Sequence, residues 1–420
     1  MKRLCGILAA LLAANSFLCA QDFAPSEQVL SFIRAGQGDS VYARCNATMR
    51  NALTPQQLST LWAGLERQFG TLQKAEAWEA EDAAAGYVIH MRQLQFRNQP
   101  IKAILSWNDN LLAGLYFRAV EATAPPTALQ SDAEGIDFEV QTGKILLPGT
   151  LLLPKKTAEK PPCIILVHGS GPADRDETVG PTPFFRQLAD SLAAAGIATL
   201  RYEKRTRVYG SATRGVSGGR LTYDEECVDD ALTAIAFAAQ HPEVDASRIY
   251  VLGHSLGGML MPRILSRSPY PLGGGIALAP PARKLPDLLR DQLGYISSLG
   301  QLPAKEVEIQ VQKILAQLPA EYLKADKKYS PTKTAARLRQ PLLLLFAGND
   351  YQVTKADADL WQSALRQKAN ATVRTLPALN HLFAPSPQVA RPEDYQHALA
   401  PSPETIRILL EWIAAAPRQR

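Results

Sequence analysis

The motif Gly253-His-Ser-Leu-Gly257 is the part of this sequence best suited to chemistry. It follows the apolar run 249–252, which has the length and composition of a buried strand, and a helical pattern comes after it. A sharp turn between a strand and a helix needs small flanking residues, and it holds the serine hydroxyl above the sheet. The motif therefore predicts a nucleophile at Ser255, the alternative being an ordinary glycine-rich turn.

A serine hydroxyl is a poor nucleophile unless an imidazole accepts its proton and a carboxylate orients that imidazole. Asp350 follows the apolar run 342–346, at the point where a buried strand should end, and we interpret it as that carboxylate. The alternative is a turn residue, because Gly-Asn-Asp sequences favour turns. Asp357 and Asp359 are weaker candidates, since they lie in a predicted helix.

Two histidines, His381 and His397, follow the serine in the chain. His381 comes after the predicted strand 372–376, in a loop that should lie above the sheet, and we interpret it as the general base. The alternative for His381 is a loop residue that only makes hydrogen bonds, whereas His397 follows a polar stretch and is expected on the surface. His90 and His241 are expected to be structural or surface residues.

Acyl transfer also needs hydrogen-bond donors for the negatively charged oxygen of the tetrahedral intermediate. The segment Val-His-Gly-Ser-Gly at 167–171 follows an apolar strand candidate and has the small side chains that such a loop requires. We therefore predict an oxyanion hole formed by the backbone N–H groups of Ser170 and Leu256. His168 is expected to brace this loop rather than to act chemically.

Two loops expected above the sheet carry opposite charges. The acidic loop is Asp174-Arg-Asp-Glu177, and the cations are Arg201, Lys204 and Arg205. One interpretation is an ion-pair network that fixes the loop that begins at residue 167, which we call the oxyanion loop. The other is an arginine that recognises a substrate carboxylate beside the acyl site, for which Arg175 and Arg201 are the candidates.

Strands and helices alternate through residues 133–418, which predicts a doubly wound, mostly parallel sheet with an antiparallel hairpin at its start. The expected strands are 135–140, 144–153, a run ending at 167, 197–201, 249–252, 275–278, 341–346 and 372–376. Amphipathic helical segments at about 284–335 interrupt this alternation, and an insertion there would form a cap over the active site. The fold class is therefore α/β.

The first part of the chain, residues 24–120, has a different pattern. Helical segments come first, and three strand-like stretches follow at 71–79, 86–97 and 101–120. This order predicts a small α+β domain without a catalytic constellation. Residues 121–132, which contain two adjacent prolines, are expected to be a linker.

The chain has the composition of an ordinary globular protein, with 420 residues, 46% hydrophobic and 20% charged residues and a formal net charge of +5. So small a charge argues against a nucleic-acid binder. Beyond residue 20, no apolar run approaches the ~20 residues of a membrane span. Cys45, Cys163 and Cys227 have neither the spacing of a metal site nor that of a disulfide framework.

Residues 1–20 have the pattern of a signal peptide: the basic pair Lys2-Arg3, an apolar segment, and a small residue at Ala20. We therefore expect the mature protein to be exported to a periplasm or beyond. Lipidation at Cys19 is the alternative, which the bulky residues just before that cysteine disfavour.

Residues 133–418 resemble an α/β-hydrolase enzyme of the bacterial carboxylesterase type. The resemblance rests on the motifs around Gly253–Gly257, on Asn349-Asp-Tyr-Gln-Val353, and on the segments 168–177, 200–205 and 380–381. It implies hydrolysis of small-molecule esters with short acyl groups, through a Ser–His–Asp triad and without a cofactor. Residues 24–120 resemble, more loosely, a cone-shaped domain of unknown function related to the nuclear-transport-factor-like fold.

Other activities share this elbow, so alternatives remain open. Prolyl-type aminopeptidases and acyl-CoA thioesterases have the same motif, and the fold can also serve as a non-catalytic binding module. One departure from the family pattern is Pro262, which is expected to kink the helix after the nucleophile or to shift its start. The sequence indicates no metal site and no oligomeric state.

Overall fold

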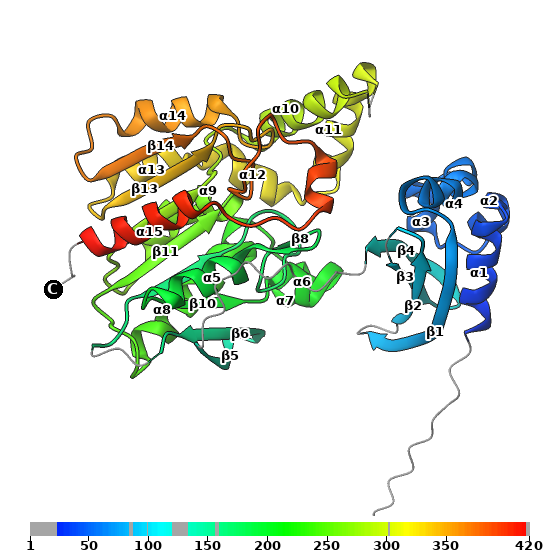
Figure 1. Ribbon diagram of the computed structural model, residues 1–420, viewed down its shortest axis with the longest axis horizontal. Coiled ribbons are helices and arrows are strands. Elements are labelled where there is room, and N and C mark those ends of the chain that lie inside the picture. The colour runs from blue at the N-terminus through cyan, green and yellow to red at the C-terminus, as the bar shows by residue number, and fades with distance from the viewer. Residues whose placement is uncertain are drawn as a thin grey trace, which may run out of the picture. The chain divides into compact units, whose positions relative to one another are not determined.

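The computed structural model describes residues 23–83, 87–98, 100–119, 133–155, 159–300 and 303–416. Two compact units divide the chain near residue 122, and each is described by itself. The expected signal peptide, 1–20, and the expected linker, 121–132, lie outside the described residues. Figure 1 shows the helices and strands of both units.

The first unit places helices against an antiparallel sheet with the strand order β1-β2-β3-β4. Its helices are α1 (Ala24–Arg34), α2 (Gly38–Tyr42), α3 (Ala47–Ala52) and α4 (Pro55–Phe69). Its strands are β1 (Leu72–Ala83), β2 (Tyr87–Phe96), β3 (Pro100–Asn108) and β4 (Leu111–Ala119). Apolar residues from α1 and β3, such as Val29, Ile33 and Leu105, are completely buried in its core.

The expected single stretch 101–120 is wrong in one respect, because the structure divides it into β3 and β4. Asp109 and Asn110 join the two strands, with φ angles of 50° and 60°. A two-residue hairpin turn requires this left-handed conformation at both positions, and Asp and Asn adopt it more readily than most residues. The described residues of this unit therefore form four strands rather than three.

The second unit is a doubly wound, mostly parallel sheet, as predicted. Its strand order is β14-β13-β12-β11-β7-β10-β6-β5, and neighbours are parallel from β14 to β10. The predicted antiparallel hairpin, β5 with β6, forms the far edge. The strands are β5 (Glu134–Thr142), β6 (Ile145–Leu153), β7 (Cys163–Val167), β10 (Ala198–Tyr202), β11 (Ile249–His254), β12 (Gly274–Leu278), β13 (Leu342–Ala347) and β14 (Ala371–Leu376).

Two groups of helices accompany this sheet (Figure 1). Helix α5 (Phe184–Ala194) packs on β10 and β6 and contacts α15 (Pro403–Ala415). Helices α8 (Asp229–Gln240), α9 (Leu256–Arg267) and α14 (Lys355–Leu365) also pack on strands of the sheet, and α8 contacts α9. Strands β7, β11 and β13 are buried along their whole length, as expected for parallel strands between helical layers.

Helices α10 to α13 occupy the stretch between β12 and β13. They are α10 (Leu285–Ser298), α11 (Val307–Ala316), α12 (Ala320–Lys328) and α13 (Pro331–Arg337). We call α10 to α12 the cap. Of the helices in the described part of the chain, none combines the length and apolar character needed to cross a membrane.

The nucleophile motif lies where the two central strands end. In the register of β11 with β7, Gly253 is opposite Val167, so the loops that follow both strands leave the sheet at the same level. Ser255 has a φ of 50° and α9 begins directly after it. A side chain at position 257 would place its Cβ atom 2.1 Å from the carbonyl oxygen of Val167. Only glycine therefore allows α9 to start this close to β7.

Of the two effects expected from Pro262, a kink in the helix or a shifted start, the shifted start does not occur. Helix α9 begins directly after Ser255 and continues through Pro262 to Arg267. A proline inside a helix removes one N–H donor, here the donor toward the carbonyl of Gly258. Residues 256–262 are all buried, and this packing holds the helix in place.

Two glycine substitutions test this close approach. We expect Gly257→Ala to lower the free energy of unfolding by about 1–3 kcal/mol, because its methyl group would overlap the backbone of β7. Gly294→Ala, in α10, is the matched control, since no atom lies within 4 Å of the added methyl group. An alanine there should be neutral or stabilising by up to about 1 kcal/mol. Urea unfolding measures both changes, and equal stabilities of the two variants would contradict the packing described here.

Candidate active site

Ser255 and His381 line one cavity of about 660 Å³. Its walls come from the loop after β7, the elbow, the loop after β14, and the cap. Cap residues in the lining are mostly apolar: Leu285, Leu288, Leu289, Ile314 and Leu318. No lysine or arginine is among the described residues that line it.

The predicted acid and base are in contact. His381 Nδ1 lies 2.6 Å from Asp350 Oδ2, and both side chains are buried. The other carboxylate oxygen accepts hydrogen bonds from the N–H groups of Gln352, at 2.7 Å, and Val353, at 3.1 Å. Because Nδ1 donates to the carboxylate, Nε2 is the nitrogen left to accept a proton on the cavity side.

The weaker candidates for the acid and the base lie outside the cavity lining. Asp357 is buried, but it is 2.9 Å from a guanidinium nitrogen of Arg283 and caps the backbone of Ala282. Asp359 is exposed and pairs with a lysine one helical turn away. His397 is exposed, as expected. Of the three candidate aspartates, only Asp350 contacts a histidine that lines the cavity.

The two predicted oxyanion donors are placed differently. Ser170 lines the cavity, and no hydrogen bond of its N–H group is found among the described residues. Leu256 is the first residue of α9, so the helix leaves its N–H group unpaired, but its side chain does not line the cavity. The N–H group of Gly169 already donates to Glu177 Oε1, at 2.5 Å. The N–H groups of Ser170 and Leu256 therefore remain the candidate oxyanion donors.

Sequence reasoning missed His254, the residue just before the nucleophile. Its Nδ1 atom lies 3.0 Å from Glu177 Oε1, and its Nε2 atom lies 3.0 Å from the carbonyl oxygen of His381. A carboxylate and a carbonyl only accept hydrogen bonds, so both ring nitrogens donate and the ring is an imidazolium. Burial alone would lower the pKa of His254, but the charge and hydrogen bond of Glu177, the hydrogen bond to the His381 carbonyl and the charge of Asp350 together outweigh it and raise that pKa.

Position 254 gives a weak signal in the sequence, because the motif Gly-x-Ser-x-Gly leaves that residue free. Glu177 gives a stronger one, since it ends the acidic loop beside the oxyanion segment. Its φ of 45° is unusual for a residue with a side chain. That conformation is tolerated where Glu177 joins Gly169 to His254.

The prediction that Arg175 and Arg201 bind substrate is not supported. Neither residue lines the cavity. Arg201 is buried and pairs with Asp176, and Arg175 pairs with Glu203 at 3.0 Å. The buried guanidinium of Arg201 needs a nearby carboxylate, which Asp176 supplies, and the partly exposed Arg175 has an acidic partner as well. The alternative interpretation, ion pairs that fix the loops, agrees with this geometry.

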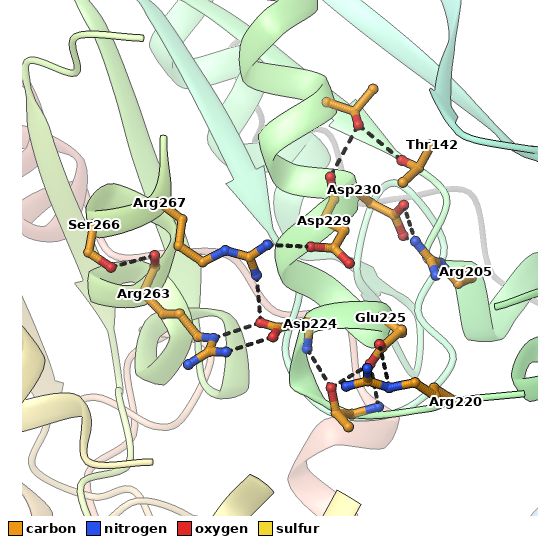
Figure 2. A network of polar contacts seen from close by, with 12 residues as sticks. Thr142, Arg205, Arg220, Asp224, Glu225, Asp229, Asp230, Arg263, Ser266 and Arg267 are labelled. Carbon is orange, nitrogen blue, oxygen red and sulfur yellow. Dashed lines mark hydrogen bonds and ion pairs between the residues drawn. The ribbon is translucent and has the colours of Figure 1, made fainter. Parts of the chain in front are cut away.

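Further ion pairs anchor the elements around the site. Arg205 and Asp230 form a buried pair at 2.5 Å, and Asp224 accepts from both Arg263 and Arg267 on α9 (Figure 2). In the described part of the chain, no three His, Cys, Asp or Glu side chains are grouped so that they could hold a metal ion.

The sequence comparisons agree on the two units. Residues 164–396 match the family described as "Alpha/beta hydrolase family", and residues 26–115 match "Protein of unknown function (DUF3887)". Esterase EstD of Thermotoga maritima is 34% identical over 370 residues, which cover 85% of this chain and 87% of that protein.

Solved structures are more distant. Est1E from Butyrivibrio proteoclasticus is 19% identical, with a TM-score of 0.45, and the match covers 67% of this chain and 100% of that one. The Pyrococcus furiosus esterase PF2001 is 17% identical, with a TM-score of 0.47, over 71% of this chain and 96% of that one.

His168 makes the stability of the fold depend on pH. It is buried against the rings of Phe185 and Tyr202, and this burial lowers its pKa from 6.5 to about 4. Between pH 6.5 and pH 4, His168 is therefore protonated in the unfolded chain but neutral in the folded chain. We expect stability to be fully present above pH 6.5 and to fall by about 3 kcal/mol as the pH drops to 4.

The substitution His168→Asn should remove this part of the pH dependence. Urea unfolding at several pH values between 4 and 7 gives the free energy of unfolding as a function of pH. The slope of this dependence should differ between the variant and the wild type. His241→Asn, at a position outside the core, is the matched control and should leave the slope unchanged. An unaltered slope in His168→Asn would show that this histidine is not buried in its neutral form.

Proposed function

Because this chain belongs to the alpha/beta hydrolase family, we propose that it hydrolyses carboxylic esters through an acyl-enzyme formed on Ser255. One observation carries the proposal: the His381–Asp350 pair, at 2.6 Å, lies at the wall of the cavity that Ser255 also lines. This combination supplies a nucleophile, a base and an orienting acid in one enclosed space.

The geometry supports a two-step reaction. Ser255 Oγ attacks the ester carbonyl while His381 Nε2 takes the hydroxyl proton, and Asp350 stabilises the resulting imidazolium. The carbonyl oxygen becomes an oxyanion, which the N–H groups of Ser170 and Leu256 stabilise. His381 then gives its proton to the departing alcohol. A water molecule attacks the acyl-enzyme in the same way, which releases the acid and restores Ser255.

The lining of the cavity favours an uncharged ester with an apolar group. Leu285, Leu288 and Leu289 of α10 present an apolar wall on the cap side. The two acidic residues in the lining already have partners, since Glu177 pairs with His254 and Glu226 with a lysine. An aminopeptidase would need a free charge to bind a peptide terminus. The acyl-CoA thioesterase alternative fits poorly with an exported protein.

We further propose that the protein is exported. Residues 1–20 support this through their basic start, apolar middle and small residue at position 20. Export places the enzyme where esters from outside the cell are its substrates.

The triad assignment predicts a pattern of kinetic losses. Ser255→Ala should lower kcat on a p-nitrophenyl ester by about 10⁴–10⁶-fold, and Asp350→Asn should cost somewhat less. Adding His381→Ala to Ser255→Ala should change little, because the two residues act as a unit. Steady-state kinetics measure these losses. If Ser255→Ala keeps more than about a tenth of the activity, the esterase does not use this serine, and a non-catalytic role for the site regains support.

Export predicts the first residue of the mature protein. Mass spectrometry of protein recovered from outside the cytoplasm should find Gln21, or its cyclised form, at the N-terminus. Intact Met1 in all of the protein would contradict export. A diacylglycerol on Cys19 would instead identify a lipoprotein anchored to a membrane.

A further inference from the structure

A buried lysine holds the peptide that joins Gly169 to Ser170. Lys204 follows β10, and its Nζ atom donates to the carbonyl oxygen of Gly169 at 2.7 Å. The N–H group of Lys204 donates to the carbonyl of Ala173 in the same loop, at 3.1 Å. Only 2% of the Lys204 side chain is exposed. Both ends of the oxyanion loop are thus fixed to this one residue.

The position of the peptide determines where the Ser170 N–H group points. A peptide group is planar, and in its trans form the C=O and N–H bonds point in opposite directions. The described residues contain no cis peptide bond. Gly169 and Ser170 line the cavity, whereas Lys204 does not, so the peptide lies between the lysine and the cavity. A carbonyl held by Lys204 therefore directs the Ser170 N–H group toward the cavity.

We propose that Lys204 is a positioning residue that sets the oxyanion hole, and that the cap holds Lys204 in place through Glu226 and Tyr322. This inference rests on the proposed esterase function. It adds a residue that does not touch the substrate but determines whether the Ser170 N–H group can stabilise the oxyanion.

The connection from Lys204 to the cap is continuous and buried. Lys204 Nζ lies 2.6 Å from Glu226 Oε1, and the hydroxyl of Tyr322 donates to Glu226 Oε2 at 2.6 Å. Tyr322 belongs to α12 of the cap. Burial alone would lower the pKa of Lys204, but nearby groups including Glu226 outweigh it and raise that pKa, so the ammonium stays charged. A movement of α12 would therefore reach the oxyanion peptide through three hydrogen bonds: Tyr322 to Glu226, Lys204 to Glu226, and Lys204 to the Gly169 carbonyl.

The segment that carries Glu226 is itself fixed to the nucleophile helix. Glu226 lies in a single π-helical turn, Asp224–Val228. Asp224 of this turn receives two hydrogen bonds from Arg263, both at 2.6 Å, and pairs with Arg267 at 2.8 Å (Figure 2). Both arginines belong to α9, which begins at the nucleophile. Glu226 therefore has a defined position relative to Ser255 as well as to the cap.

Lysine suits this position for a chemical reason. Its ammonium group has three donors on one atom, so it can serve a carbonyl and a carboxylate together. A buried ion pair is in itself weak evidence for a contribution to stability. A neutral, apolar replacement would lose two bonds, the one to the Gly169 carbonyl and the one to Glu226.

The main experiment compares Lys204→Met with the double substitution Lys204→Met/Glu226→Gln. The single variant leaves a buried carboxylate without its cation and can lose stability for that reason alone. The double variant removes both charges, yet it still lacks the donor to Gly169. Glu226→Gln alone keeps Lys204, and is the matched control for the loss of the carboxylate charge.

The readouts are kcat and KM on a p-nitrophenyl ester, and the affinity for a trifluoromethyl ketone, which forms a tetrahedral adduct with the active serine. In both variants that lack Lys204, we expect kcat to fall about 10²–10³-fold, as for the loss of one oxyanion donor. Affinity for the ketone should fall by a similar factor, and KM should change by less than about threefold. Glu226→Gln should show a much smaller fall in kcat.

A second pair of variants tests the connection to the cap. Tyr322→Phe removes the hydrogen bond to Glu226, and we expect a fall of about three- to tenfold in kcat with a parallel loss of ketone affinity. Tyr223→Phe is the control, because the Tyr223 hydroxyl bonds to Asp326 of α12, at 2.7 Å, and not to Glu226. It should leave kcat unchanged.

Wild-type kcat or ketone affinity in the double variant would overturn the role of Lys204. Losses in kcat that merely follow thermal stability across the variants would overturn it as well. Equal kcat in Tyr322→Phe and Tyr223→Phe would overturn the coupling to the cap. Failure of the esterase proposal can be told apart from failure of the Lys204 proposal. In that case the wild-type protein itself would show no hydrolysis that depends on Ser255.

Discussion

The buried ion pair between His254 and Glu177 is the interaction on which the rest of the site depends. His254 precedes the nucleophile, and its two ring nitrogens contact Glu177 and the carbonyl oxygen of His381, each at 3.0 Å. Glu177 in turn accepts the N–H group of Gly169. One imidazolium thus joins the elbow, the base loop and the oxyanion loop, three segments that are far apart in the chain. Their relative positions are set inside the protein before any substrate arrives.

A second set of contacts fixes the same loop from the other side. Lys204 holds the carbonyl of Gly169, while Glu177 holds its N–H group, so the residue is fixed at both ends. Electrostatic stabilisation of a transition state depends on donors that are already oriented, because no energy is then spent on turning them during the reaction. The connection through Glu226 to Tyr322 links this orientation to the cap, whose leucines line the cavity.

Much of this arrangement can be predicted from the sequence, because parallel strands leave simple patterns. Apolar runs mark the strands, and the residues after them, such as Asp350 and His381, must lie at one edge of the sheet. Opposite charges, in contrast, do not show which partners meet. The sequence therefore leaves open whether Arg175 and Arg201 bind a substrate carboxylate or pair with acids, and in the structure both pair with acids. The role of His254 also depends on contacts between distant loops, which no local pattern records.

The central claim is that Ser255 is the activated nucleophile, and covalent labelling tests it most directly. A fluorophosphonate reacts with an activated serine and loses fluoride, which leaves a stable phosphonyl group on the oxygen. Peptide mapping by mass spectrometry should find that group on Ser255 and on no other residue, and His381→Ala should abolish the labelling. Labelling of a different residue, or labelling that persists without His381, would contradict the account.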